Sequence, residues 1–111
     1  MSSKASSRAL DTVPSERAFY FYSEIGKPLG IIASSLKEFG AVIKSLEPSS
    51  IEFHLRRGDF EKWVHMLGDG ELATSLAKLG EGSLRAEKLR AELVRVVQTR
   101  IRQLQRQPSK K

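Results

Sequence analysis

Apolar residues recur every three or four positions over most of the chain after Ser35, which is the spacing of one face of an α-helix. A first helix is predicted between Ser35, which has Glu38 three residues on, and Pro48. Its apolar positions are Leu36, Phe39, Val42 or Ile43, and Leu46.

The densest stretch of apolar anchors and helix caps covers residues 49–69. Pro48 and Ser49 offer a helix start, and Ser49 with Glu52 has the spacing of a capping box. Gly58 can end that helix in the left-handed conformation, after which Asp59 can cap the next one directly. The apolar stripe of this second helix is Phe60, Trp63, Val64 and Leu67. Gly68 and Asp69 then close it and open another helix over residues 70–79.

The last predicted helix runs from about Leu84 to Arg106, with Ser83 as its cap and Pro108 beyond its end. Its apolar stripe comprises Ala86, Leu89, Leu93, Val96, Val97, Ile101 and Leu104. Lys88, Arg95, Arg102 and Arg106 lie on the opposite face. Arg100 is an exception because it falls within the apolar stripe, where it either extends past the core edge or contacts a partner.

Ahead of the helices, Ala18 to Tyr22 is a run of β-formers bounded by Gly26 and Pro28, and residues 29–32 are its expected antiparallel partner. Residues 1–16 are polar and are predicted to form a flexible arm. Residues 107–111 are predicted to form a basic tail. The prediction is therefore one mainly α domain over residues 17–106, with about five helices, a short N-terminal β hairpin and a long basic C-terminal helix.

Several segments resemble a known family. Ser-Ile-Glu-Phe-His-Leu-x-Arg-Gly-Asp-Phe-Glu-x-Trp, followed by Leu-Gly-Asp-x-x-Leu-Ala, is similar to a family of small prokaryotic domains of unknown function, mainly archaeal (DUF5752). The Phe-Tyr-Phe-Tyr run, the Ser-Leu-x-Glu-Phe segment and the Leu- and Arg-rich last helix extend the resemblance over about residues 18–104. The resemblance implies a mostly helical domain with a short β element and carries no activity or ligand.

The amino-acid composition limits the cellular environments in which the protein is expected. The 111 residues include no cysteine, which excludes disulfides and thiolate metal sites and suits a reducing interior. Asparagine is absent and 29% of residues are charged, a pattern that fits a thermophilic source. No apolar run approaches the roughly 20 residues of a membrane span, and the N-terminus is no secretory signal. A cytoplasmic protein is expected.

The positive charge is concentrated at the C-terminal end. Residues 1–84 carry 10 basic and 11 acidic residues, whereas residues 85–111 carry 9 basic and 2 acidic ones. The basic row of the last helix has almost no acidic residue at the spacing that would pair along it, and arginine suits phosphate oxygens. We therefore expect structured RNA, or a ribonucleoprotein such as the ribosome, as partner in preference to DNA. The expected nucleic-acid-binding residues are Lys88, Arg95, Arg102, Arg106, Lys110 and Lys111.

Catalytic chemistry finds little support in the sequence. His54 and His65 match no metal pattern, and His54 shares a face with Ile51 and Leu55, which favours a packed histidine. Asp59 and Asp69 each follow a glycine at a helix boundary, so helix capping explains them better than paired carboxylates do. No catalytic residue, metal site or cofactor is predicted, and an enzyme is not expected.

Two alternatives stay open. Phe19 and Phe21 are expected in the core, whereas Tyr20 and Tyr22 could equally pack or form a stacking platform for unpaired bases. The competing function is a protein–protein interaction or regulatory module, with a homodimer as one form of it. In that case the apolar stripe of the last helix would extend beyond its own core and pair with a second helix.

Overall fold

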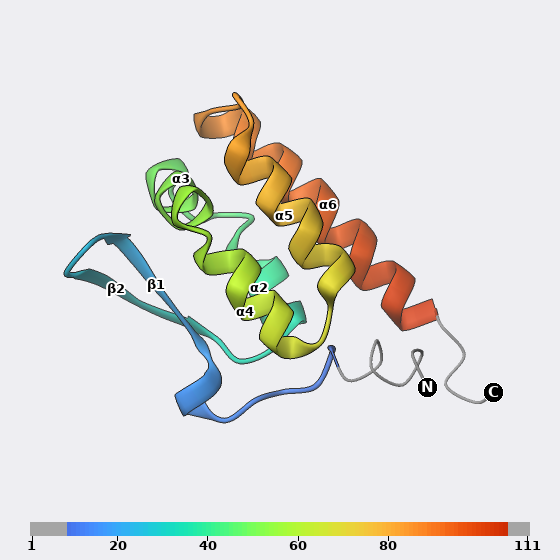
Figure 1. Ribbon diagram of the computed structural model, residues 1–111. Coiled ribbons are helices and arrows are strands. Elements are labelled where there is room, and N and C mark those ends of the chain that lie inside the picture. The colour runs from blue at the N-terminus through green and yellow to red at the C-terminus, as the bar shows by residue number, and fades with distance from the viewer. Residues whose placement is uncertain (1–8, 107–111) are drawn as a thin grey trace.

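A computed structural model describes residues 9–106 as one turn of 3₁₀-helix, a β hairpin and five α-helices (Figure 1). The element order is η1 (Ser15–Arg17), β1 (Phe19–Glu24), β2 (Lys27–Ala33), α2 (Leu36–Val42), α3 (Pro48–Arg57), α4 (Asp59–Leu67), α5 (Gly70–Glu81) and α6 (Ala86–Arg106). The predicted mainly α fold, with an N-terminal hairpin and a long last helix, is confirmed. In these residues no helix combines the length and the apolar character that crossing a membrane requires.

The hairpin pairs β1 with β2 in antiparallel register. Phe19 lies opposite Ala33 and Tyr20 opposite Ile32, and two irregularities in the pairing follow toward the turn. Strand alternation turns Phe19 and Phe21 into the core, where they are 8% and 1% exposed. Their expected core positions are therefore confirmed.

Residues 9–16 are the described part of the segment that the sequence assigns to a polar arm. Ala9 is fully buried, and the backbone N–H of Val13 donates to the carbonyl of Ser34 at 2.8 Å. Residues 1–8 lie outside the described chain, as do residues 107–111 of the expected basic tail.

Local capping signals explain most helix boundaries. The Ser35 hydroxyl accepts from the N–H of Glu38 at 3.1 Å and begins α2. Gly58, between α3 and α4, has a φ of 79°, the left-handed conformation expected for it. The predicted capping box is wrong: Pro48 is the first residue of α3 and Glu47 precedes the helix, so Ser49 lies within its first turn. Proline at this position needs no N–H partner, which makes it the stronger start signal.

A side chain of α3, and not the predicted cap Ser83, binds the start of α6. The carboxylate of Glu52 accepts from the N–H of Ala86 at 2.6 Å, and α6 begins at Ala86, two residues later than predicted. Arg56 donates from one nitrogen to the carbonyl of Gly80 at 2.8 Å and from another to that of Leu84 at 2.9 Å. Gly80 lies so close to α3 that an added Cβ would collide with the carbonyl oxygen of Leu55.

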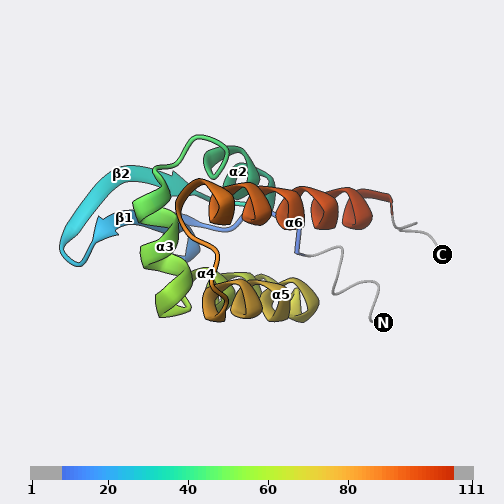
Figure 2. The same ribbon diagram turned by 90° about the horizontal axis from the view of Figure 1, so that it is seen from above.

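The core lies between the inner face of the hairpin and the five helices. Figures 1 and 2 show α5 and α6 running side by side, with the hairpin projecting at the other end of the molecule. An aromatic cluster joins the layers, because Phe19, Phe39, Phe60 and Trp63 have ring centroids within 4.9 to 6.2 Å of a neighbour. This packing places β1 directly beside α3 and α4.

Candidate functional site

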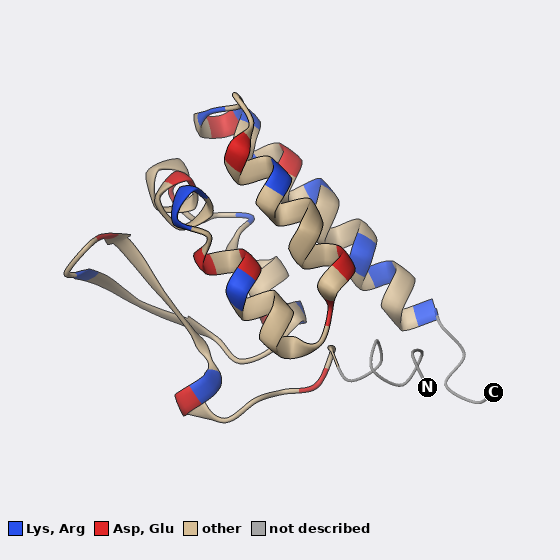
Figure 3. Cartoon of the chain, in the orientation of Figure 1, with Lys and Arg blue, Asp and Glu red and all other residues tan. Residues whose placement is uncertain are grey.

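The predicted basic face lies on α6 and is open to solvent. Lys88, Arg95, Arg102 and Arg106 are all exposed, and Figure 3 shows basic positions spaced along this helix. At 1.5 Å of rise per residue, the row extends about 27 Å from Lys88 to Arg106. Lys110 and Lys111, also predicted to bind nucleic acid, lie outside the described residues.

The acidic residues of α6 pair along the helix more than the sequence indicated. Arg95 forms an ion pair with Glu92, and Arg90 forms one with Glu87 at 2.6 Å. The expectation that the basic row has almost no acidic partner is therefore wrong for Arg95, because pairs three residues apart are as close as pairs four apart. Hydrogen bonding from Arg95 lowers the pKa of Glu92. Within residues 9–106, Lys88, Arg102 and Arg106 have no ion pair.

Arg100, the exception in the apolar stripe, makes a buried ion pair within its own chain. Its Nε lies 2.8 Å from one carboxylate oxygen of Asp69, and a terminal nitrogen lies 3.1 Å from the other. Asp69 is 2% exposed and also accepts from the N–H of Leu72, as the predicted cap of α5. Both expectations for Arg100, extension past the core edge and contact with a partner, are replaced by this pair.

Five of the seven residues in the apolar stripe of α6 are buried by its own domain, whereas Ala86 is exposed and Val96 is half-buried. Leu89, Leu93 and Val97 are fully buried, and Ile101 and Leu104 are at most 6% exposed. The helix packs against α2, α3 and α5. These contacts leave little of the stripe for the helix–helix pairing that a homodimer through α6 would need.

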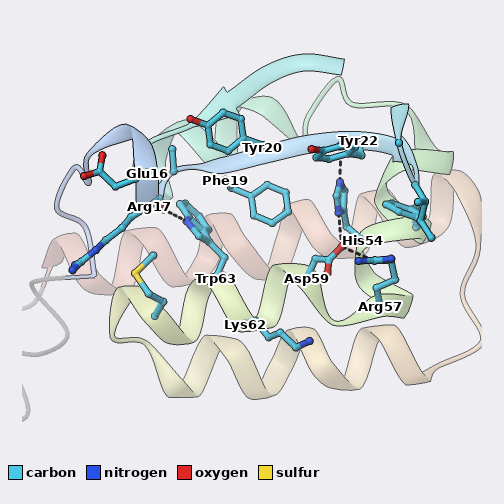
Figure 4. Close-up of a pocket in the computed structure, with 15 residues that line it drawn as sticks. Glu16, Arg17, Phe19, Tyr20, Tyr22, His54, Arg57, Asp59, Lys62 and Trp63 are labelled. Atoms are coloured by element: carbon cyan, nitrogen blue, oxygen red, sulfur yellow. Dashed lines mark hydrogen bonds and ion pairs between the residues drawn. The ribbon is translucent and has the colours of Figure 1, made fainter. Parts of the chain in front are cut away.

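A second candidate site is a groove of 690 Å³ between the hairpin and α4, here called the β1–α4 groove (Figure 4). Its lining comes from residues 16–20, Tyr22 and the hairpin turn on one side, and from α3 and α4 on the other. Aromatic or apolar side chains in the lining include Tyr20, Tyr22, Phe53, Trp63 and Met66. Its cations are Arg17, Arg57 and Lys62. The size lies in the range of about 300–1,000 Å³ typical of ligand pockets.

One end of the groove is organised by His54, which is 2% exposed. The backbone N–H of Tyr22 donates to its Nε2 at 2.9 Å, so Nδ1 carries the proton and donates to Asp59 at 2.9 Å. Asp59 also accepts from Nε of Arg57 at 3.1 Å. The predicted capping role of Asp59 is therefore wrong: the residue begins α4, and its carboxylate binds these two side chains.

The chemistry open to this cluster is limited by its hydrogen bonds. Burial lowers the pKa of His54, although the hydrogen bond with Asp59 opposes the shift. A neutral ring whose Nε2 already accepts a backbone proton has no free lone pair for general-base catalysis. The packed histidine predicted from the sequence is confirmed. No group of three or more metal-ligating side chains exists among the described residues.

Main-chain atoms along the outer edge of β1 and just before it are held by side chains from the helices. Ser50 donates its hydroxyl to the carbonyl of Tyr22 at 2.6 Å, and the indole N–H of Trp63 donates to the carbonyl of Arg17 at 2.7 Å. Together with the His54 bond, these contacts fix the segment from Arg17 to Tyr22 onto α3 and α4.

The two tyrosines that the sequence left open both line the groove. Tyr20 is 48% exposed and donates its hydroxyl to the carbonyl of Ser15 at 2.8 Å, while Tyr22 is half-buried. The groove itself was missed, because it joins segments some 30 to 45 residues apart. The one local signal was the alternation of the Phe-Tyr-Phe-Tyr run, which places both tyrosines on the face away from the core.

Comparison with known proteins places the chain in a family without defining its activity. No curated protein and no solved structure matches it. A family model described as a family of unknown function, DUF5752, matches residues 2–98, which include the hairpin, the corner at Gly58 and most of α6. The match covers far more than half of the chain, and the protein belongs to the DUF5752 family.

Proposed function

We propose that this protein is a non-enzymatic binding module that contacts structured RNA, alone or within a ribonucleoprotein such as the ribosome, through the basic face of α6. The observation that carries the proposal is the exposure of Lys88, Arg102 and Arg106 without an ion-pair partner in residues 9–106. Unpaired cations in a row repel one another unless an anion lies across them, and a phosphate backbone supplies such anions. A cytoplasmic setting is part of the proposal.

The rest of α6 supports a rigid, positioned face. Its opposite side is buried, Arg90 donates to the carbonyl of Lys44 as well as pairing with Glu87, and Glu52 holds its first turn. Phosphate contacts made by such a helix fix the position of the protein on the RNA but do not distinguish one base sequence from another. Arg95 is expected to contribute less than its three neighbours, because an RNA phosphate would have to displace Glu92.

The test compares two variants of equal net charge. The first replaces Lys88, Arg102 and Arg106 with glutamine. The matched control replaces Lys37, Lys44 and Lys78, which are exposed on α2, in the turn that follows it and on α5, and which lie outside the β1–α4 groove. Binding of total cellular RNA is measured at three salt concentrations.

We expect the α6 variant to bind more weakly and its plot of log affinity against log salt to flatten by about 0.7–0.9 for each lost contact. The log–log salt slope of the control variant should differ from that of the wild type by less than the roughly 0.7–0.9 that one phosphate contact contributes. If the two variants lose affinity equally, net charge and not the α6 face governs binding, and the proposal is overturned.

A further inference from the structure

We propose that the β1–α4 groove binds unpaired nucleotides of the same RNA, with bases against its tyrosines and phosphates facing its cations. The inference rests on the proposed function for the class of partner, but it concerns a different surface and different residues. Figure 4 shows the groove running between β1 and α4, with Tyr20 and Tyr22 along one side, Lys62 on the other and Arg17 and Arg57 toward its two ends.

The groove exposes apolar and aromatic surface that the fold does not use. Tyr20 is 48% exposed and Met66 is 42% exposed, and Ile25 at the hairpin turn reaches 75%. Trp63 and Phe19 line it from below, where they are already packed into the core. Every base has a π-face, so aromatic side chains of this kind accept bases without regard to sequence.

The charges around the groove favour an anion. Three cations, Arg17, Arg57 and Lys62, face two acids, Glu16 and Asp59. Asp59 is already bound by His54 and Arg57, which leaves Glu16 as the acid without an ion pair in the described chain. Among residues 9–106, Arg17 and Lys62 have no ion pair, so the unpaired cations of the groove outnumber its one unpaired acid, and phosphate oxygens complement them.

The strand edge beside the groove argues against an extended peptide as the ligand. A peptide that adds a strand needs free main-chain N–H and C=O groups. At Tyr22 both groups are bonded, to His54 and to Ser50, and the carbonyl of Arg17 is bonded to Trp63. What remains for a ligand is side-chain chemistry, namely ring faces and cations. Stacking and ionic contacts are the means by which single-stranded nucleic acids are bound.

Further contacts order the side chains of the groove before a ligand binds. The Tyr20 hydroxyl is held by the Ser15 carbonyl, and the guanidinium of Arg57 lies 5.0 Å from the centre of the Phe53 ring while bonded to Asp59. A site that is already ordered loses less conformational entropy on binding, which favours affinity for a short ligand.

Trp63 provides a direct readout because it is the only tryptophan of the chain and lines the groove. The probe is a four-residue oligouridylate, too short to form a duplex, titrated into the full chain at low salt while the tryptophan fluorescence is followed. We expect a saturable change. An acidic peptide of four residues containing phenylalanine serves as the competing probe.

Two pairs of variants locate the contact. Tyr22→Leu removes a ring and should weaken binding about 5- to 150-fold, the range for one stacked base, whereas Tyr22→Phe keeps the ring and should bind within about twofold of the wild type. Lys62→Gln should flatten the salt slope by about 0.7, whereas Lys78→Gln, outside the groove, should not change it. Lys62 is exposed, so its variant tests the site even where Tyr22→Leu fails to fold.

The outcomes separate this inference from the proposed function. The variant of Lys88, Arg102 and Arg106 should bind the oligouridylate as the wild type does, because the short probe uses only the groove. A probe that produces no saturable change, or equal binding by Lys62→Gln and the wild type, overturns the groove assignment and leaves the α6 face unaffected. Binding of the acidic peptide without binding of the oligouridylate also overturns it.

Discussion

The guanidinium of Arg100 and the carboxylate of Asp69 form a two-point ion pair between α6 and the start of α5. The distances are 2.8 and 3.1 Å, and the side chains are 12% and 1% exposed. Hydrogen bonding with Asp69 raises the pKa of Arg100, so the guanidinium stays charged throughout the neutral range. The ion pair connects two consecutive helices through residues that lie 31 positions apart in the sequence.

Arg100→Met tests the importance of this pair for the fold. The change leaves the Asp69 carboxylate buried with the N–H of Leu72 as its hydrogen-bond partner, and an uncompensated buried charge costs about 3–5 kcal/mol. We expect a loss of about 3 kcal/mol in the free energy of unfolding, measured by urea denaturation. The loss should largely persist in high salt, because the Asp69 carboxylate is 1% exposed and salt screens a partly buried pair less than a surface pair. Arg102→Gln, on the exposed face, is the control and should change stability by less than about 0.5 kcal/mol.

Gly58→Val tests the corner between α3 and α4. Gly58 has a φ of 79°, and an added Cβ would meet only the Glu61 side chain, at 3.5 Å. The cost is therefore one of backbone strain and not of collision, and we expect about 1–3 kcal/mol. Gly58→Asn should cost less, because asparagine tolerates this conformation. An unchanged melting temperature for the valine variant would contradict the corner geometry.

Sequence patterns predicted the elements of this fold well because their signals are local. A stripe of apolar residues three or four apart must face a core, so the helices follow from spacing alone. Gly58 could be assigned because few other residues adopt its conformation. At the start of α3 two local signals competed, a proline at Pro48 and a capping box at Ser49. The capping box was predicted, whereas the helix begins at Pro48.

The sites were harder to predict because they depend on contacts between distant segments. Arg100 was recognised as out of place, but its partner Asp69 could not be found by spacing along one helix. The groove combines Tyr20 and Tyr22 with Lys62 and Trp63. Its hydrogen bonds join helix side chains to the backbone of β1 and of the segment just before it. Contacts between distant segments leave no periodic pattern in the sequence. The α6 face was predictable because one helix carries it entirely.

Burial of His54 predicts that stability depends on pH in a defined direction. Its pKa is lowered in the folded state by burial, against an ordinary value near 6.5, so the unfolded chain binds the proton first as the pH falls. The contribution of His54 is complete above about pH 6.5 and is lost progressively below it, down to the lowered pKa. The free energy of unfolding should fall by at most about 1.4 kcal/mol per pH unit in that window.

His54→Gln checks this assignment. The variant is expected to be less stable at pH 7.5, since the bonds with Tyr22 and Asp59 are disturbed, and its stability should vary less between pH 6.5 and 5. His65→Gln is the control, because that histidine is exposed on α4. Urea denaturation at four pH values supplies the measurement. Parallel pH profiles for the wild type and His54→Gln would show that His54 is not the group responsible.

Removal of residues 107–111 tests whether Lys110 and Lys111 extend the RNA-binding face proposed for α6. If both lysines contact phosphates, the truncated chain should bind RNA more weakly, and its log–log salt slope should flatten by about 1.4–1.8. The deficit should shrink as salt rises, because counterion release is the part of the free energy that is lost. A full-length variant with Lys110→Gln and Lys111→Gln separates charge from chain length. Equal behaviour of the truncated and substituted proteins assigns the effect to charge, whereas a wild-type slope in both would restrict the binding face to the helix.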